Sequence, residues 1–279
     1  MNNLLLSLLS LGVIQGISEF LPISSSGHLV LFESIPFFRE TLDASGENME
    51  LFVNVSLHLA TLMAVVIYLW RDIIRLSGGL ISGISQRNYK KDEIRVIINI
   101  IAASIPAGIL GVLFHGFFER LFTSYTIVFF MLIINGLVLL STKIVPIKNR
   151  KLEEIGVVRS VLVGICQSIA IIPGISRSGS TIAGGIILGL NPGEAARFSF
   201  LMAIPVITGA GLLEILKVFQ KEVSFTFIFP LIVSMFVTMI VGLISLKVLF
   251  ILVKKIRIDI FGYYTILLGI LGIIYIQIR

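Results

Sequence analysis

Long apolar runs separated by short polar segments dominate the chain. Six of these runs are long enough to cross a bilayer, because about 20 mostly apolar residues span its hydrocarbon core as a helix. They lie at about Leu51–Trp70, Ile94–Phe114, Tyr125–Ser141, Phe198–Val218, Phe225–Val253 and Ile260–Ile278. The pattern therefore predicts six transmembrane helices.

Two further apolar stretches, Leu4–Phe32 and Val157–Leu190, are interrupted in the middle. The interruptions read LPISSSGH at Leu21–His28 and IPGISRSGST at Ile172–Thr181. Clusters of Pro, Gly and Ser break helices, so each stretch is predicted to be two helices joined by a polar turn. The N-terminal run has no Lys or Arg before it and no small-residue cleavage pattern, so it does not resemble a signal peptide. We expect it to belong to the fold.

The composition points to a membrane protein. Of 279 residues, 56% are apolar and only 14% are charged, and the mean hydropathy is +1.03. A soluble domain carries roughly 25% charged residues, and a disordered chain or a disulfide-stapled module would also differ strongly from these values. The single cysteine, Cys166, cannot form an internal disulfide. We expect one integral membrane domain over residues 1–279.

The distribution of charge predicts the orientation. The net charge is +6, and basic residues gather in three loops, Arg71–Arg95, Lys143–Arg159 and Lys254–Arg257, whereas Glu33–Glu50 is acidic. Basic loops lie in the cytoplasm, which places the acidic loop outside. This topology closes only if both interrupted stretches return to the side they entered from, the first from outside and the second from the cytoplasm. The sequence has no basic patch interleaved with aromatic residues, so nothing in it suggests that the protein binds nucleic acid.

An internal repeat relates the two interrupted stretches. A shift of 152 positions aligns Gly12–Gly27 with Gly164–Gly179 without a gap, with seven of sixteen positions identical. Each half, at about 1–142 and 157–279, then contains one re-entrant helical hairpin and three transmembrane helices. Because three is odd, the halves insert in opposite orientations. The predicted fold is an all-α polytopic membrane protein with an inverted repeat, whose hairpin tips meet near the middle of the bilayer.

The polar residues at these tips are the candidate site. Non-helical backbone at bilayer depth is tolerated only in protein or beside a wet cavity. A charge at that depth costs about 3 kcal/mol, so an intramembrane pair of Glu19 and Arg177 indicates function. The alternative is a buried structural pair that joins the hairpins. The tips carry Gln15, Glu19, Ser24, Ser25, Ser26 and His28 in the first half, and Ser176, Arg177, Ser178 and Thr181 in the second.

These residue types suit a phosphate and a divalent cation. Gln15 and Glu19 are four residues apart and share a helix face, where they could offer oxygen ligands to Mg²⁺ or Ca²⁺. The SSSG and SRSG turns each open a helix, whose free N–H groups and serine hydroxyls bind anions together with Arg177. His28 could act as base, acid or nucleophile. Among weaker candidates, His58 either reaches the pocket or packs between helices, and Glu194 and Arg197 lie in a first turn.

With these motifs the sequence resembles the undecaprenyl-diphosphate phosphatase family, also called the bacitracin-resistance protein family. GVIQGISEFLPISSSGHL and PGISRSGST match its two signatures, and the resemblance runs the whole length. It implies that Glu19 and Gln15 bind the metal and that Ser25 or His28 is the nucleophile or base, with Arg177 and Glu19 also catalytic. The implied phosphate contacts are Ser24, Ser26, Ser176, Ser178 and Thr181.

The resemblance further implies hydrolysis of a polyprenyl (undecaprenyl) diphosphate to the monophosphate and phosphate, which recycles the lipid carrier for peptidoglycan synthesis. The site is then expected to face outside, at the cell membrane. The expected partners are the polyprenyl diphosphate lipid and the membrane, with a homodimer left open. A polyprenyl-phosphate flippase or anion transporter is the main alternative, because inverted repeats with broken helices are typical of transporters. A structural scaffold is the remaining alternative.

Overall fold

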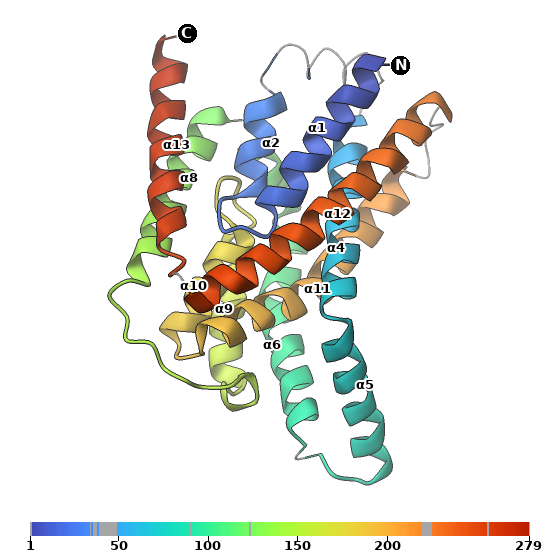
Figure 1. Ribbon diagram of the computed structural model, residues 1–279, viewed down its shortest axis with the longest axis vertical. Coiled ribbons are helices and arrows are strands. Elements are labelled where there is room, and N and C mark those ends of the chain that lie inside the picture. The colour runs from blue at the N-terminus through green and yellow to red at the C-terminus, as the bar shows by residue number, and fades with distance from the viewer. Residues whose placement is uncertain are drawn as a thin grey trace.

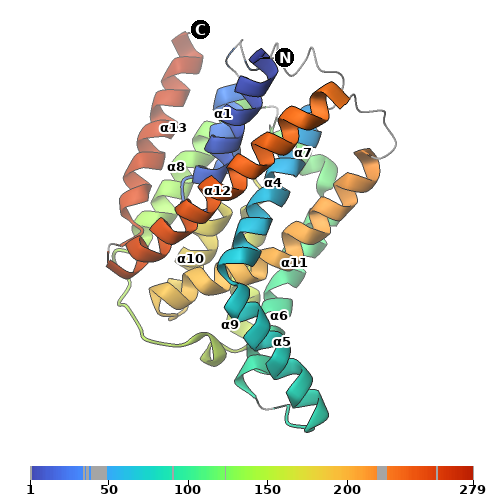
Figure 2. The same ribbon diagram turned by 45° about the vertical axis from the view of Figure 1, so that its right-hand side comes forward.

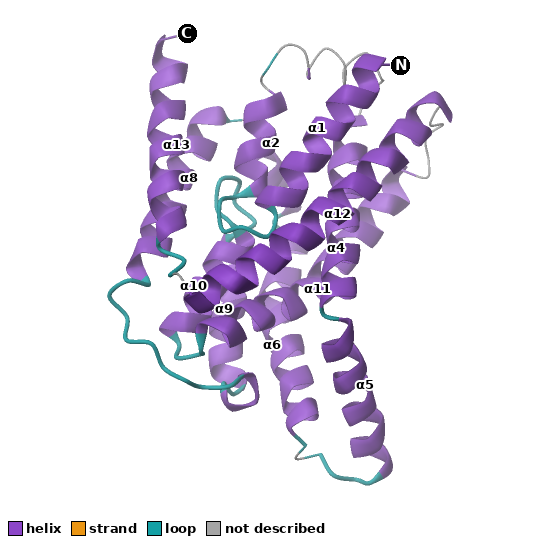
Figure 3. Ribbon diagram, viewed as in Figure 1, coloured by secondary structure: helices purple, strands orange, loops and turns teal. Residues whose placement is uncertain are grey.

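The computed structural model describes residues 2–33, 35, 38, 49–89, 91–122, 124–218, 225–255 and 257–278. Within these ranges the regular structure is helical, apart from an isolated bridge between Arg150 and Leu190, as Figure 3 shows. The helices are α1 (Asn2–Ser18), α2 (Ser25–Glu33), α4 (Met49–Tyr68), α5 (Trp70–Ser85), α6 (Asp92–Leu113), α7 (His115–Phe122), α8 (Tyr125–Ser141), the short 3₁₀ helix η1 (Leu152–Glu154), α9 (Val157–Ile169), α10 (Arg177–Ile187), α11 (Pro192–Val218), α12 (Phe225–Lys255) and α13 (Ile260–Ile278).

The lengths of these helices fit several membrane spans. In the described ranges, four helices are long and apolar enough to cross by themselves, at Asp92–Leu113, Pro192–Leu212, Phe227–Lys255 and Ile260–Ile278. Two bent pairs, α4 with α5 and α7 with α8, bring the number to as many as six. The chain is thus a multi-pass membrane protein, and the six transmembrane helices that the apolar runs predict equal the upper limit of this number.

The outer surface is apolar, as lipid contact requires. Ile101, in the middle of α6, is 57% exposed, and Phe236, in the middle of α12, is 58% exposed. Buried positions in turn include polar side chains such as Gln15, Asn135 and Thr181. A soluble protein would bury such isoleucines and phenylalanines. This distribution therefore agrees with the composition.

The prediction that the basic segment Arg71–Arg95 is a loop is wrong for the first part of the segment. Most of it forms α5, which continues α4 after a bend of 70°. Its apolar positions recur at helical spacing, and Leu76 and Gly83 are buried where α5 packs against α6. The basic residues are typical of a loop, but the apolar residues between them have the amphipathic pattern of a helix.

Small residues allow the helices to approach closely. A Cβ on Gly12 of α1 would lie 2.6 Å from Ser234 Oγ and Thr238 Oγ1 of α12. In the same way, Gly136 of α8 faces Gly262 of α13, with a Cβ at Gly136 only 2.6 Å from the Gly262 carbonyl oxygen. Such contacts are typical of helices in lipid, where packing and hydrogen bonds replace the hydrophobic drive. They bring the helices of the two halves together.

Two hairpins approach one another from opposite ends of the molecule. In Figure 1, α1 and α2 lie on the side of both chain termini, whereas α9 and α10 lie on the other side. The polar turns between their helices meet, because the Gly174 N–H donates to Ser26 Oγ at 3.2 Å. The hairpin tips thus lie together inside the bundle, as the sequence predicts.

The three basic segments lie away from the chain termini. Figure 1 and Figure 2 show the junctions α5–α6 and α8–α9 in the lower part of the molecule, and the junction α12–α13 near mid-height, at the end of α13 opposite the C-terminus. The acidic segment Glu33–Glu50, predicted to lie on the opposite side, falls mostly outside the described residues. The molecule therefore has one end rich in cations.

Candidate active site

Serines begin the two inner helices. Ser24 adopts a left-handed φ of 71°, and its Oγ accepts a hydrogen bond of 3.2 Å from the Gly27 N–H at the start of α2. Ser176 caps α10 in the same way, accepting from the Gly179 N–H at 3.1 Å. Serine is a preferred N-cap because its hydroxyl satisfies a backbone N–H that has no partner within the helix. The prediction that each turn opens a helix is confirmed.

A direct ion pair joins the two tips. Arg177 Nη2 donates to Glu19 Oε1 at 2.7 Å, and the side chains are only 16% and 6% exposed. The partners come from the two halves of the chain, 158 positions apart. A charge-assisted hydrogen bond between two poorly solvated groups is stronger than a neutral one. The pair therefore sets how the two hairpins meet.

The second carboxylate oxygen of Glu19 gathers residues of the first hairpin. Gln15 Nε2 donates to Glu19 Oε2 at 3.1 Å, and Ser25 Oγ donates to the same oxygen at 2.8 Å. A buried carboxylate needs such donors to offset the loss of water. Ser25 is thus held against a potential base, which is the geometry expected of an activated nucleophile.

His28 is turned toward another part of the bundle. Its Nδ1 donates to the Ser24 carbonyl oxygen at 2.8 Å, and its Nε2 lies 2.8 Å from the hydroxyl of Tyr264 on α13. The two rings stack with centroids 5.8 Å apart. Both nitrogens are therefore engaged, and the structure joins His28 to Tyr264 rather than to Glu19.

Hydroxyls predicted to contact phosphate bind other parts of the hairpins. Ser26 Oγ lies 3.2 Å from Ser24 Oγ, and Ser178 Oγ lies 3.1 Å from Ser176 Oγ. Ser178 also donates to the backbone oxygen of Glu19 at 3.3 Å.

Thr181 shares a hydrogen bond of 2.6 Å with Ser199 of α11 and donates to the Arg177 carbonyl oxygen. These bonds tie the two tips to each other and to α11. Phosphate contact by the five hydroxyls stays a prediction.

Two buried polar atoms beside Glu19 lack a hydrogen-bond partner within the described part of the chain. They are Arg177 Nη1, a donor, and Gln15 Oε1, an acceptor. A buried group without a partner costs free energy unless something binds it. The donor suits a phosphate oxygen, and the acceptor suits a cation.

The donor set fits a divalent cation that substrate helps to bind. The described residues contain no cluster of three or more His, Cys, Asp or Glu that could enclose a metal. Glu19 and the Gln15 amide oxygen supply oxygen ligands only, and Mg²⁺ commonly binds to one or two carboxylates plus substrate phosphates. The residues present are therefore compatible with a predicted Mg²⁺ or Ca²⁺ site.

His58 reaches Glu19, so of the two alternatives that its sequence position leaves open, the structure favours a place at the site. Its Nε2 lies 3.6 Å from Glu19 Oε2, its Nδ1 donates to the Asn54 carbonyl oxygen, and 39% of its side chain is exposed. A carbonyl oxygen can only accept, so the proton of a neutral ring lies on Nδ1 and Nε2 faces the carboxylate. His58 therefore adds a fourth side chain around Glu19.

Asn135 of α8 is a site residue that sequence reasoning missed. Its Oδ1 accepts from the Ser176 N–H at 2.9 Å, and its Nδ2 donates to the Pro22 carbonyl oxygen at 3.3 Å. It thus bridges the two polar turns while fully buried. An amide inside the apolar run Tyr125–Ser141 was the signal that could have found it.

Arg197 and Glu194, predicted in a first turn, do lie near the start of α11. Arg197 forms an ion pair with Asp72 of α5, and its Nη1 lies 3.7 Å from Glu194 Oε2. This cluster fastens the bend between α4 and α5 to α11. It shares α11 with the surroundings of the Glu19 site but none of the residues that contact Glu19.

Comparison with known proteins identifies the family of the chain. The model of the family described as "Bacitracin resistance protein BacA" matches residues 8–271, which contain both tips. A protein named Undecaprenyl-diphosphatase from Moorella thermoacetica is 40% identical over 261 residues, 94% of each chain. Proteins of the same name from Methanosphaera stadtmanae and Rubrobacter xylanophilus are 37% identical over 280 residues, 97% of each chain, and 36% identical over 268 residues, 96% of each chain. The chain therefore belongs to the bacitracin resistance protein BacA family.

Proposed function

We propose that this protein is an undecaprenyl-diphosphate phosphatase, which hydrolyses the lipid diphosphate to the monophosphate and inorganic phosphate and so recycles the lipid carrier. The observation that carries the proposal is the Glu19–Arg177 pair, flanked by Ser25 and by an unpartnered guanidinium nitrogen, in a family whose members bear this activity in their names. Phosphoryl transfer needs mainly positioning and charge stabilisation. This site offers both at the meeting point of two hairpins.

Arg177 is the phosphate contact in this proposal. Its Nη2 is held by Glu19, and its Nη1 remains available in the same plane for an oxygen of the terminal phosphate. The planar guanidinium can make two directed bonds at once, which an ammonium group cannot. Negative charge that develops on the phosphoryl group is then stabilised without any movement of Arg177.

Ser25 is the favoured nucleophile, since its hydroxyl already donates to Glu19. Ser25 Oγ attacks the terminal phosphorus, Glu19 takes the hydroxyl proton, and the bond to the bridging oxygen breaks, which releases the lipid monophosphate. Water then hydrolyses the phosphoserine to inorganic phosphate and restores the serine. His28 as the nucleophile is the alternative, and its engagement by Ser24 and Tyr264 weighs against it.

A divalent cation, Mg²⁺ or Ca²⁺, belongs to the proposal. Glu19 and Gln15 Oε1 would hold it together with the substrate phosphates, and when bound it neutralises phosphate charge. Excess chelator should abolish phosphate release, and added Mg²⁺ or Ca²⁺ should restore it. Gln15→Ala should raise the cation concentration for half-activation by about tenfold, whereas Glu19→Gln should abolish activation. Full activity in excess chelator would contradict the metal requirement.

We also infer an inverted repeat. The Ser24 and Ser176 caps are 152 positions apart, as the aligned repeat requires. Helix packing supports the same relation, because exchanging the halves turns the pair α1–α12 into α9–α6 and leaves the pair α8–α13 unchanged. Opposed hairpins are the expected product of such a repeat.

The orientation follows from charge. The end that carries the three basic segments belongs in the cytoplasm of a cell whose plasma membrane holds the protein. The first hairpin, with Glu19, Ser25 and His28, then enters from outside, and the pocket opens outward. A homodimer stays a prediction that the mass of the detergent-solubilised protein can check.

Phosphate release by purified protein in detergent micelles tests the proposed function. An enzyme releases inorganic phosphate from undecaprenyl diphosphate there, whereas transport alone cannot be observed without a sealed membrane. No release in micelles, together with translocation of polyprenyl phosphate in vesicles, would favour the flippase alternative.

A further inference from the structure

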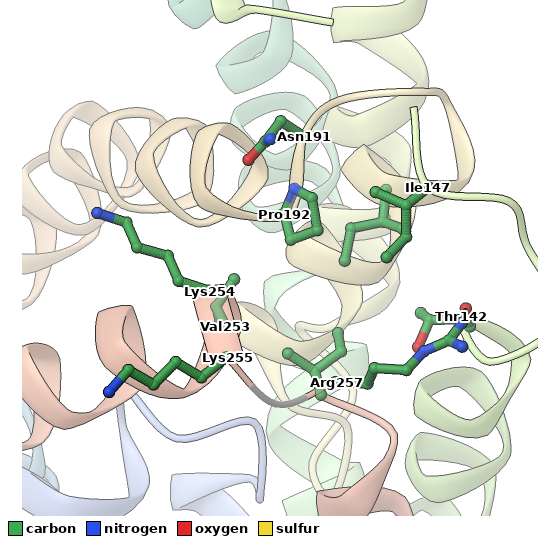
Figure 4. A pocket seen from close by; sticks show the side chains of 10 residues that line it. Thr142, Ile147, Asn191, Pro192, Val253, Lys254, Lys255 and Arg257 are labelled. Atoms are coloured by element: carbon green, nitrogen blue, oxygen red, sulfur yellow. Dashed lines mark hydrogen bonds between the residues drawn. The ribbon is translucent and has the colours of Figure 1, made fainter. Parts of the chain in front are cut away.

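A cavity lies at the basic end of the molecule. Its volume is about 290 Å³, and residues from the end of α8, the start of α11 and the end of α12 line it. Figure 4 shows Lys254 and Lys255 extending from α12 on one side, and Arg257 extending toward Thr142 on the other. Ile186 on its wall is nine residues along α10 from Arg177, about 13 Å at the rise of an α-helix. The cavity is therefore separate from the Glu19 site.

Cationic side chains are among the residues that line the cavity. Lys254, Lys255 and Arg257 contribute three cations, and in the ranges that the structure describes neither lysine pairs with a carboxylate. Arg257 Nε lies 3.8 Å from Asp259 Oδ1. Its Nη2 donates to the carbonyl oxygens of Thr142 and Lys143, just after α8. Lysines in the last turn of a helix interact favourably with the helix dipole, which is one reason for Lys254 and Lys255 at the end of α12. The dipole does not explain why a cavity lies beside them. The surplus charge suits an anion.

The start of α11 forms another part of the cavity wall. Pro192 begins the helix, and Asn191 Oδ1 accepts a hydrogen bond of 2.9 Å from the Gly193 N–H. The Lys254 side chain runs beside this turn, with its Cε 3.8 Å from the position of a Cβ on Gly193. Because the Gly193 N–H is already engaged by Asn191, the group on this wall that favours a phosphate is the Lys254 ammonium.

The remaining lining is apolar, which distinguishes a lipid from a free ion. Ile186, Val253 and Ile258 are buried on the wall, and Ile147 lies at the exposed edge. Inorganic phosphate gains nothing from such a surface, whereas the glycerol and first acyl carbons of a lipid do. Beside the cavity, Ile260 is 55% exposed on the outer surface of α13, where an acyl chain could continue.

We propose that this cavity binds the phosphate headgroup of an anionic membrane lipid at the basic end of the protein. Basic pockets between transmembrane helices on the cytoplasmic side suit such headgroups. The occupant is a lipid other than the one hydrolysed at Glu19, and the proposal does not depend on the hydrolytic activity.

Lipid retention by the full chain tests the proposal. Protein in nanodiscs of phosphatidylcholine with a minor fraction of phosphatidylglycerol is extracted into mild detergent, and bound lipid is counted by native mass spectrometry. Lys254→Gln together with Lys255→Gln should lower phosphatidylglycerol retention by about tenfold and leave phosphatidylcholine unchanged. Phosphate release from undecaprenyl diphosphate should stay at its starting rate in this variant.

The matched control removes two cations at the same end but away from the cavity. Arg71→Gln together with Arg75→Gln, on the exposed side of α5, should retain phosphatidylglycerol as the unchanged protein does. Equal loss in both double variants would overturn the proposal, since it would show only general attraction to anionic lipid. Inorganic phosphate at millimolar concentration should not displace the lipid, and complete displacement would overturn the assignment of a lipid.

Discussion

Glu19 is the residue through which the other side chains of the site act on one another. Its two oxygens are shared among Arg177, Ser25 and Gln15, and His58 stands 3.6 Å away. Because Oε1 takes one nitrogen of Arg177, the other nitrogen is aimed and rigid before any substrate arrives. Burial of the Glu19–Arg177 pair costs free energy, but the charged hydrogen bond between them fixes the direction of the free Arg177 Nη1 donor. The site is therefore preorganised for a phosphate.

At this scale, Arg177→Lys should reduce the turnover number for phosphate release by about 10²-fold or more, because the ammonium cannot hold Glu19 and a phosphate in two directed bonds. The measurement is phosphate release in micelles. Arg159→Lys, which changes a residue at the start of α9 outside the site, should keep normal turnover. Near-normal turnover in Arg177→Lys would show that Arg177 is only a counter-charge to Glu19.

Substitutions of the neighbouring serines Ser24 and Ser25 should have different effects, one on stability and the other on turnover. Ser25→Ala should lower turnover by about 10³-fold with little change in unfolding temperature, because it removes the proposed nucleophile. Ser24→Ala should instead lower the free energy of unfolding by about 1 kcal/mol, because it removes the cap of α2. Turnover and thermal unfolding are measured on both. A fully active Ser25→Ala protein would transfer the nucleophilic role to His28 or to water.

Helices and their starts follow from local sequence, whereas the contacts between them do not. The serine caps and the proline at the start of α11 lie next to the backbone they control, so their patterns predict the inner helices and α11. His28 meets Tyr264 across 236 positions, and no local pattern specifies that meeting. The signal of α5 is local, but its basic residues are typical of a loop while its apolar periodicity is that of an amphipathic helix, so the two patterns conflict.

Among the helices, we expect α8 to stabilise the contact between the two hairpin tips through Asn135. Asn135→Ala leaves the Ser176 N–H and the Pro22 carbonyl oxygen buried without this partner. We expect the free energy of unfolding to fall by about 2 kcal/mol, with lower turnover in the folded fraction. Thermal unfolding in detergent measures the first effect. Asn149→Ala, in the segment before α9, is the control and should leave both quantities unchanged, whereas an equally stable Asn135→Ala protein would contradict the bridging role.

On the scale of the whole molecule, the site exists only where the two halves meet. Glu19 and Ser25 come from one hairpin and Arg177 from the other, so neither half contains the complete arrangement. The hairpins approach from opposite ends of the molecule, and in the described residues the three basic segments lie away from the chain termini. If the halves are an inverted repeat, as we propose, the repeat alone does not distinguish the two faces, and we expect the loop charges to decide which hairpin faces outward.

The sidedness of the pocket is the last prediction. In a Cys166→Ser background, a cysteine introduced by Ser26→Cys in the first hairpin should react with a membrane-impermeant thiol reagent added to intact cells. Ser85→Cys, at the exposed end of α5, should react only after the cytoplasmic face is opened, and it controls for intact membranes. The reverse pattern would show that the proposed orientation is inverted. Labelling of Ser26→Cys from both sides would instead indicate alternating access, because only a transporter exposes one site to each face in turn.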